Sequence, residues 1–405
     1  MRVLTFTSLF PNSAKPQFGV FVSQRMAHFA KRAGNSVHVV APVPYFPSWL
    51  PDNQRQHWSQ IPRQEQVNNM TVFHPRYPLL PGVSMAVHGL LMFLGSFSVV
   101  RQLSRSMHFD CIDAHYVYPD GFAAVLLGKA LNLPVIVTAR GSDINLFPAF
   151  RSIRPQIRWT LQKASGVIGV SAALKDAMVA LGIARDTIEV IGNGVDLTRF
   201  APIDSKEAKS RLGIPVDARA IVSIGALTPV KGFHFLIPSL ASILPRYPKA
   251  RLYIVGEGKD RNKLESLIHE LGLQEHVFLV GSKPNEELKF WYSAADLSCL
   301  VSAREGWPNV VLESLACGTP VLATRIGGIP EILTSQELGV FVEQNRESIA
   351  TGLEFALSKQ WERSAIASYA RRRTWDDVAI EVENYLLSCS EKSTVGPARK
   401  EFPAT

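Results

Sequence analysis

The sequence predicts an α/β protein built from two doubly wound domains. Its 405 residues exceed what a single hydrophobic core usually organises. Short β-branched runs alternate with amphipathic helical patterns along the whole chain, which is typical of parallel sheets with crossover helices. No short repeat is visible, which argues against a solenoid. The hydrophobic content of 46% and charged content of 19% indicate a folded globular chain rather than a disordered one.

The first half of the chain carries seven strand patterns. They lie at 2–8, 36–42, 70–75, 111–115, 134–139, 166–171 and 187–192. Amphipathic stretches at 20–32, 119–131 and 171–181 predict helices between them. The polar run 49–69 predicts a mobile loop. The apolar run 83–100 approaches the roughly 17–25 residues of a membrane span, but its serines and glycines, and the arginines after it, favour a packed core helix.

The second half repeats this logic. Its six strand patterns lie at 219–225, 250–256, 276–282, 295–301, 320–325 and 338–343. Turn formers and Pro202 predict a linker between the halves. The expected organisation is a first domain over 1–192, a linker over 193–205, a second domain over 206–374, a helix at about 375–387 that packs back on the first domain, and a disordered tail over 388–405.

Charge is distributed unevenly along the chain. Lys and Arg number 43 against 35 Asp and Glu, and residues 1–200 hold 19 basic and 10 acidic side chains while 201–405 hold 24 and 25. The first half should therefore attract anions. In the stretch 150–163, Arg151, Arg154 and Arg158 fall on one side of an expected helix; this is either a contact for an anionic membrane or a solvated charged face. No nucleic-acid module is present.

The four cysteines are widely spaced and show no metal-binding or disulfide pattern. They predict reduced thiols in a cytoplasmic protein. No DxD triplet is present, so we expect neither a bound divalent cation nor any required cofactor. No GxGxxG follows a strand, which argues against a dinucleotide-dependent dehydrogenase.

The densest chemical signal is SAREGWPNVVLESLACGTPVLAT at 302–324. Pro308 suits the first turn of a helix, whose free N–H groups and positive dipole end would hold an anion such as a diphosphate. Glu305 precedes this helix and Glu313 lies within it. Carboxylates accept hydrogen bonds from sugar hydroxyls. The alternative is a pair of solvated glutamates that flank an amphipathic helix.

This segment, with GGIPEIL at 327–333 and VIGNGVD at 190–196, resembles the family-4 retaining glycosyltransferases, and the resemblance runs over residues 1–387. It implies the GT-B fold, in which two Rossmann-like domains face each other across a cleft. It also implies transfer of a hexosyl group from a UDP- or GDP-linked sugar with retention of configuration, and donor contacts at Gly306 and Asn309.

SIGALTPVKGFHFLI at 223–237 is similar to the family's donor-phosphate loop. Lys231 would neutralise the diphosphate as a point charge, and Gly232 would keep the approach open. The family's pattern GRL reads GAL here, so Ala226 replaces a cation. Arg140, in RGSD at 140–143, either supplies the missing charge or is a surface Arg near Asp143.

Three further positions carry open alternatives. His115, in DAHYVYPDG at 113–121, either hydrogen-bonds the donor sugar, as in similar enzymes, or is a structural histidine. Gly19 either lets backbone N–H groups approach the reaction centre or serves a turn that starts a helix. Glu257, in VGEGKDR at 255–261, either borders the nucleotide base, as the resemblance implies, or belongs to a bare turn.

The resemblance favours a front-face reaction in which the departing diphosphate helps to deprotonate the acceptor. The expected acceptor is a lipid-linked or polysaccharide glycan, at the inner face of a cell membrane. Two alternatives remain. One is a catalytically silent, glycosyltransferase-like binding subunit, which Ala226 favours. The other is a nucleotide-sugar 2-epimerase, whose own acidic catalytic groups we do not find.

Overall fold

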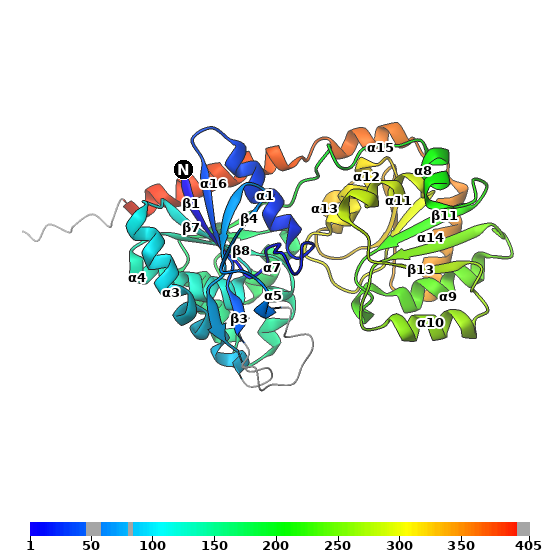
Figure 1. Cartoon of the computed structure of the whole chain (residues 1–405). Helices are drawn as coiled ribbons and strands as arrows, with labels where there is room; N and C mark the ends of the chain where they lie inside the picture. The colour runs from blue at the N-terminus through cyan, green and yellow to red at the C-terminus, as the bar shows by residue number, and fades with distance from the viewer. Residues whose placement is uncertain (46–57, 80–83, 395–405) are drawn as a thin grey trace, which may run out of the picture. The chain divides into compact units, whose positions relative to one another are not determined.

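The structure is a computed structural model that describes residues 1–45, 58–79 and 84–394. The chain divides into two compact units (Figure 1). Unit 1 comprises Met1–Gly192 together with the chain from Asp376 onward, and unit 2 comprises Asn193–Trp375. The break at Gly192 coincides with the end of the first expected domain.

Unit 1 is built on an eight-stranded sheet with the order β10-β9-β8-β7-β1-β2-β5-β4. Its strands are β1 (Arg2–Phe6), β2 (Ser36–Val40), β4 (Gln64–Val67), β5 (Met70–Phe73), β7 (Cys111–His115), β8 (Val135–Ala139), β9 (Gly166–Gly169) and β10 (Ile188–Val190). All neighbours are parallel except β4, which is antiparallel to β5. Every residue of β7 and β8 is buried, as expected for central strands covered on both faces. A small parallel pair joins β3 (Val43–Tyr45) and β6 (Arg76–Pro78).

The helices of unit 1 follow its strands in crossover order. They are α1 (Val20–Lys31), α3 (His88–Ser106), α4 (Phe122–Leu131), α5 (Ser142–Asn145), α6 (Arg154–Lys163) and α7 (Ala172–Ala180), joined at the end of the chain by α16 (Trp375–Thr394). One-turn helical segments include η1 (Ser84–Val87) before α3 and η2 (Val117–Gly121) before α4.

Two sequence expectations for unit 1 were wrong. The segment 64–67 is the edge strand β4 and not loop, because it pairs with β5 through a tight turn at Asn68 and Asn69, both of which adopt positive φ. Residues 49–57 of that expected loop lie outside the described residues. The run 83–100 is not a core helix: α3 buries one face and exposes the other, with Leu94 59% exposed.

Unit 2 contains a six-stranded parallel sheet with the order β13-β12-β11-β14-β15-β16. Its strands are β11 (Arg219–Ile224), β12 (Ala250–Val255), β13 (Val277–Gly281), β14 (Leu297–Leu300), β15 (Val321–Thr324) and β16 (Gly339–Val342). Its helices are α8 (Ser205–Leu212), α9 (Phe233–Ile243), α10 (Arg261–Glu270), α11 (Leu288–Ala294), α12 (Asn309–Ala316), α13 (Ile329–Ile332), α14 (Arg346–Ser358) and α15 (Arg363–Ala370).

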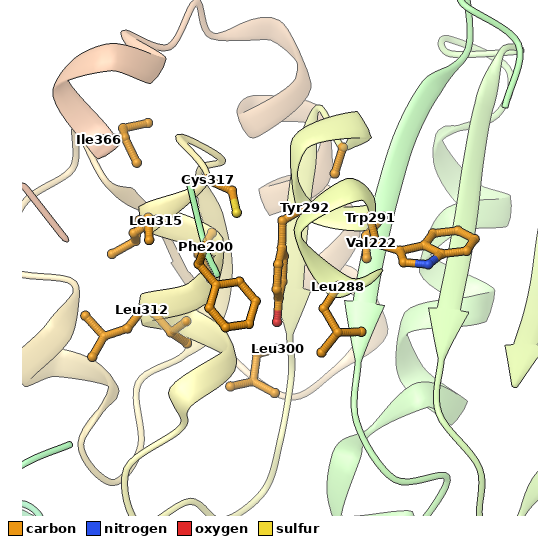
Figure 2. Packing of buried hydrophobic residues seen from close by; sticks show 14 of the residues in the cluster. Phe200, Val222, Leu288, Trp291, Tyr292, Leu300, Leu312, Leu315, Cys317 and Ile366 are labelled. Atoms are coloured by element: carbon orange, nitrogen blue, oxygen red, sulfur yellow. The ribbon is translucent and has the colours of Figure 1, made fainter. Parts of the chain in front are cut away.

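Two apolar clusters cover the two faces of the unit 2 sheet. Alternate residues of β11 divide between them, with Val222 in one and Ile221 in the other, as the two-residue period of a strand requires. Figure 2 shows the cluster of Val222, where the rings of Phe200 and Tyr292 lie side by side with centroids 6.1 Å apart. Helices α11 and α12 both contribute to this layer, so the core fixes the helix that carries Glu313.

The expected linker and tail are more ordered than the sequence predicts. The linker segment packs into unit 2, where Val195 and Phe200 are buried in the core and Val195 pairs with Thr374. Helix α16 continues through Thr394, so residues 388–394 of the expected disordered tail are helical. Buried Cys389 lies against Gly166 of unit 1, which holds this last part of the helix in place. Residues 395–405 lie outside the described residues.

Candidate functional site

The order of the unit 2 sheet identifies where a ligand site belongs. It is the doubly wound order in which the chain runs outward from β11 in one direction and from β14 in the other. The loops that follow these two adjacent strands diverge at their carboxyl ends and leave a crevice there. The β11 loop carries Ala226 and Lys231, and the β14 loop carries Glu305 and Gly306.

Lys231 and Glu305 meet at this point. Lys231 Nζ donates a hydrogen bond of 2.6 Å to Glu305 Oε1, and their side chains are 22% and 12% exposed. The sequence predicts both residues as donor ligands from segments far apart in the chain, and the structure brings them together. A partly exposed cation and carboxylate can exchange their mutual contact for a ligand that offers both phosphate oxygens and hydroxyls.

Gly232 is required by the packing of these loops. Its φ is +72°, and a Cβ on it would lie 2.3 Å from the carbonyl oxygen of Val301. It directly precedes α9, so it sets how closely the β11 loop approaches the β14 loop. The carbonyl of Gly306 accepts a 2.9 Å hydrogen bond from Gly328 N–H, which fixes the other side of the site.

The N-terminus of α12 points its free amides at the end of the β14 loop. Pro308 is the N-cap, one residue earlier than the predicted first-turn position, and no side chain caps the helix. No acidic residue stands in the first turn. The Asn309 side chain accepts a 2.9 Å hydrogen bond from Asn193 Nδ2. An uncapped helix start of this kind suits an anion.

Glu313 lies within α12 and is half-buried. Burial raises the pKa of its carboxyl to about 7, and the Tyr292 hydroxyl donates to it at 3.0 Å. Tyr292 itself is fully buried in the core. Tyr292 was not predicted from the sequence, because an aromatic residue in an apolar helix is usually a core residue and nothing nearby marks its hydroxyl.

Glu257 follows β12, next to the β11 loop. Its carboxylate pairs with Arg261 at 2.7 Å, and its carbonyl accepts from Leu227 N–H at 3.0 Å. Ala226 is exposed at the same edge. The position where the family pattern has an arginine is therefore open to solvent within unit 2. A longer side chain there would not have to fit into a packed core.

Unit 1 has its own switch point, between β1 and β7, and His115 stands at the carboxyl end of β7. The His115 ring is fully buried. Arg140 Nη2 donates to Nδ1 at 2.7 Å, and Nε2 lies 3.2 Å from Asp113 Oδ2. Because an arginine can only donate, the ring is the tautomer with its proton on Nε2. Burial lowers the pKa of His115 to about 4.

Both ring nitrogens of His115 thus face side chains of unit 1, which supports the structural alternative. Its role toward a donor sugar stays a prediction. Arg140 is half-buried and bound to this ring, so it is not the surface arginine of the second alternative. Asp143 accepts from the backbone N–H groups of Arg140, Gly141 and Val117, which fixes the loop after β8.

Asp113 and Arg25 complete this buried array, and neither was predicted from the sequence. Asp113 is fully buried; burial alone would raise its pKa, but the neighbouring His115 ring and the positive charge of Arg25 lower it to about 2. Arg25 is 1% exposed, and its Nη1 donates to Thr138 at 3.4 Å. The only indication in the sequence was that Arg25 falls on the apolar face of an expected amphipathic helix.

Gly19 serves its own loop. Its φ is +66°, and a Cβ would lie 2.3 Å from the carbonyl of Leu9. This agrees with the alternative of a turn that starts a helix, since α1 begins at Val20. Nearby, buried Asp120 accepts hydrogen bonds from the backbone and hydroxyl of Ser8, which ties the β1 loop to the β7 loop. Burial raises the pKa of Asp120 to about 7.

Metal ligands do not gather in either unit: among the described residues, no group of three His, Cys, Asp or Glu side chains could hold an ion. The four cysteines are buried as free thiols.

Two family models match the chain in succession. Residues 20–199 match the family described as Glycosyltransferase Family 4, and residues 204–373 match Glycosyl transferases group 1. A putative teichuronic acid biosynthesis glycosyltransferase, TuaC, of Bacillus subtilis (strain 168) is 28% identical over 359 residues, which are 87% of this chain and 88% of that protein. A D-inositol 3-phosphate glycosyltransferase of Corynebacterium urealyticum is 32% identical over 249 residues, which are 58% of this chain and 59% of that protein.

Solved structures with the same architecture cover nearly the whole chain. Sucrose-phosphate synthase from Thermosynechococcus elongatus aligns over 96% of this chain and 99% of its own, with a TM-score of 0.75 and 18% identity. Anabaena HepE, solved in complex with UDP and glucose, aligns over 96% and 100%, with a TM-score of 0.71 and 20% identity. With both halves matched by glycosyltransferase families and the doubly wound sheets in place, the chain belongs to the GT-B glycosyltransferases of family 4, with a group 1 second domain.

Proposed function

We propose that this glycosyltransferase takes a UDP- or GDP-linked sugar as donor and binds it on unit 2. The observation that carries the proposal is the Lys231–Glu305 contact beside the uncapped start of α12, at the β11/β14 switch point. One site offers a cation and free amides for a diphosphate and carboxylates for hydroxyls. The structure of HepE, which shares the fold, contains UDP and glucose.

Within this proposal each donor group has a matching residue. Lys231 and the amides after Pro308 hold the diphosphate, Glu305 and Asn309 orient the sugar, and Glu313 accepts from the ribose. Gly232, Glu257 and Gly306 supply the further proposed donor contacts on unit 2. The donor roles of Gly19, His115 and Arg140 in unit 1 stay predictions from the sequence. No metal ion or cofactor is assigned a role.

The proposed reaction retains configuration by a front-face route. The bond between the anomeric carbon and the diphosphate breaks first, and its electron pair leaves with the diphosphate. The acceptor hydroxyl adds to the anomeric carbon from the same face and gives its proton to a diphosphate oxygen. Lys231 and the α12 dipole stabilise the charge that develops on the leaving group, which is where fixed charges contribute most to rate.

For the acceptor we propose a lipid-linked or polysaccharide glycan, handled in the cytoplasm at the inner face of a cell membrane. The relative TuaC carries a name that refers to teichuronic acid biosynthesis. The excess of basic residues in the first half of the chain fits an anionic acceptor or an anionic surface.

The test is calorimetric titration of UDP, GDP and ADP, each with and without an attached hexose, on the full chain. We expect one nucleotide to bind saturably. Glu313→Ala should weaken binding of that free nucleotide, whereas Glu305→Gln should remove only the additional affinity that the sugar supplies. Glu270→Gln, at an exposed site on α10, is the matched control and should bind as wild type does.

Absence of binding for every nucleotide at millimolar concentration would overturn the transferase proposal. The catalytically silent binding subunit would then be the better account, because exposed Ala226 leaves the β11 loop with one cation fewer than the family pattern.

A further inference from the structure

Helix α3 presents a continuous exposed stripe along unit 1. Val87 and Leu90, 46% and 43% exposed, are followed one turn later by Leu94 at 59%. The stripe continues through exposed Ser98 to Arg101 and Arg105. These positions are three or four residues apart, so they share one face of the helix. Its first half is apolar and its second half is basic.

The opposite face of α3 is built into the unit. Met92, Ser96 and Val100 are fully buried there. The helix approaches its neighbours so closely that a Cβ on Gly89 would lie 2.6 Å from the Phe122 ring and one on Gly95 would lie 2.5 Å from the Arg76 carbonyl. The segment Ser84–Ser106 is long and apolar enough to span a membrane: an 18-residue stretch of it has a mean hydropathy of 1.4, and 28% of that 18-residue stretch is buried. If α3 crossed a bilayer, its buried face would lose these contacts with the rest of unit 1.

Helix α6 adjoins the start of this stripe. Gln156 Nε2 donates to the carbonyl of Ala86 at 2.7 Å, which links α6 to η1. Phe150, just before α6, is 41% exposed, and Arg151 and Arg154 are exposed beside it. Neither 84–106 nor 147–163 contains an Asp or Glu. The joined surface of η1, α3 and the start of α6, here called the α3–α6 face, is therefore apolar and basic.

We propose that the α3–α6 face docks on an anionic lipid bilayer, with α3 lying in the plane of the interface. Leu90 and Leu94 enter the boundary between headgroups and acyl chains, and the arginines contact lipid phosphates, as interfacial helices do. The charge complementarity of a face without any acidic residue selects an anionic surface. This inference deepens the membrane association proposed above, and it assigns that association to α3 in addition to the basic helix α6.

The experiment is co-sedimentation of the full chain with phosphatidylcholine vesicles and with vesicles of equal parts phosphatidylcholine and phosphatidylglycerol. Wild type should bind the anionic vesicles and lose that binding as salt rises. Leu90→Gln with Leu94→Gln should weaken the partition coefficient by tenfold or more, since each leucine buries apolar surface. Arg101→Gln with Arg105→Gln should weaken it by about fivefold for each charge. Phe355→Gln on unit 2, at a residue 54% exposed, is the matched control.

Equal vesicle binding by the Leu90/Leu94 variant and wild type would overturn the proposal, as would failure of wild type to bind either vesicle. A switch from dimer to monomer in that variant, measured by light scattering, without a change in vesicle binding would instead assign the face to a second copy of the chain. Nucleotide titration of the same variants separates this inference from the donor proposal, because the altered residues lie in unit 1 and the nucleotide is assigned to unit 2.

Discussion

Both units have charged residues at the switch point of their sheet, but these residues are buried to different degrees. At the β1/β7 switch point of unit 1, Asp113 and His115 are fully buried and Arg25 is 1% exposed. At the β11/β14 switch point of unit 2, Lys231 and Glu305 stay 22% and 12% exposed. A doubly wound sheet determines where strand-end loops meet, but burial decides whether the charges there stabilise the unit or remain available to a ligand.

Burial also determines what each group contributes to folding. Charges removed from water need partners within the fold, and removing one partner leaves the others uncompensated. A partly exposed pair keeps solvent as an alternative partner and contributes little to stability. Unit 1 should therefore respond to substitution by losing stability, and unit 2 by losing affinity.

The largest effect should follow Asp113→Asn. Loss of this carboxylate removes a buried negative charge beside Arg25 and Arg140. It should lower the free energy of unfolding by about 3–5 kcal/mol, measured by denaturant titration. Asp217→Asn, which breaks the exposed 2.6 Å pair with Lys249, is the control and should leave the midpoint nearly unchanged.

The dependence of stability on pH below about 4 gives a second test of Asp113. The folded pKa of Asp113, about 2, lies below its ordinary value of 3.8. Its contribution to stability is thus present above about pH 4 and lost as pH falls toward 2. Asp113→Asn should flatten the wild-type loss of stability in that window. A variant as stable as wild type at neutral pH would show that the array does not depend on this charge.

In unit 2 we expect the opposite result, a loss of nucleotide affinity with little loss of stability. Lys231→Ala removes a charge-assisted contact to the diphosphate and should raise the Kd of the preferred nucleotide roughly 10- to 100-fold, measured by calorimetry. The nucleotide-free protein should unfold within about 1 kcal/mol of wild type, because the pair is partly exposed. Lys249→Ala is the control. A large loss of stability without a change in Kd would place Lys231 with the structural charges of unit 1.

A third, smaller effect concerns Glu313, the one carboxylate of the proposed donor site that resembles the buried groups of unit 1. Its folded pKa of about 7 lies above its ordinary value of 4.5, so the native state holds a proton that the unfolded chain has released. Stability therefore falls as pH rises between these values. At pH 8, the free energy of unfolding of Glu313→Gln should exceed that of wild type by roughly 1–3 kcal/mol. Below pH 5 the variant should show little gain in stability. It should also bind nucleotide more weakly than wild type. Equal gains at both pH values would contradict the raised pKa.

The sequence predicted the fold well because the signals for a parallel sheet are local. Thirteen strand patterns correspond to strands of the two large sheets, and Lys231 and Glu305, predicted from separate segments, lie in contact. β4 was missed because a short polar edge strand such as Gln64–Val67 looks like a loop until its partner is known. The tail was misread because its helix is held by a non-local contact between Cys389 and Gly166.

The buried array of unit 1 escaped the sequence for a related reason. Asp113 belongs to a strand, Arg25 to a helix and Arg140 to a loop, so their proximity depends on tertiary structure alone. For His115 the sequence left two accounts open. In the structure, Arg140 and Asp113 lie against the two ring nitrogens, and these neighbours favour the structural account.

The smallest effect should come from restoring a cation to the β11 loop. Ala226 is exposed, so Ala226→Arg adds a guanidinium without disturbing the core and should lower the Kd of the preferred nucleotide up to about tenfold through paired contacts to the diphosphate. Ala226→Lys should gain less because an ammonium is a point charge, and Ala226→Gln should gain nothing.

That order, Arg before Lys before Gln, separates a phosphate contact from a general increase in positive charge. If all three variants bind as wild type does, the diphosphate is held without this loop position. Arg140 then becomes the residue to test, by Arg140→Gln: a loss of affinity with unchanged stability would make it a donor cation. A loss of stability would instead place it with Asp113 and Arg25 as part of the structure of unit 1.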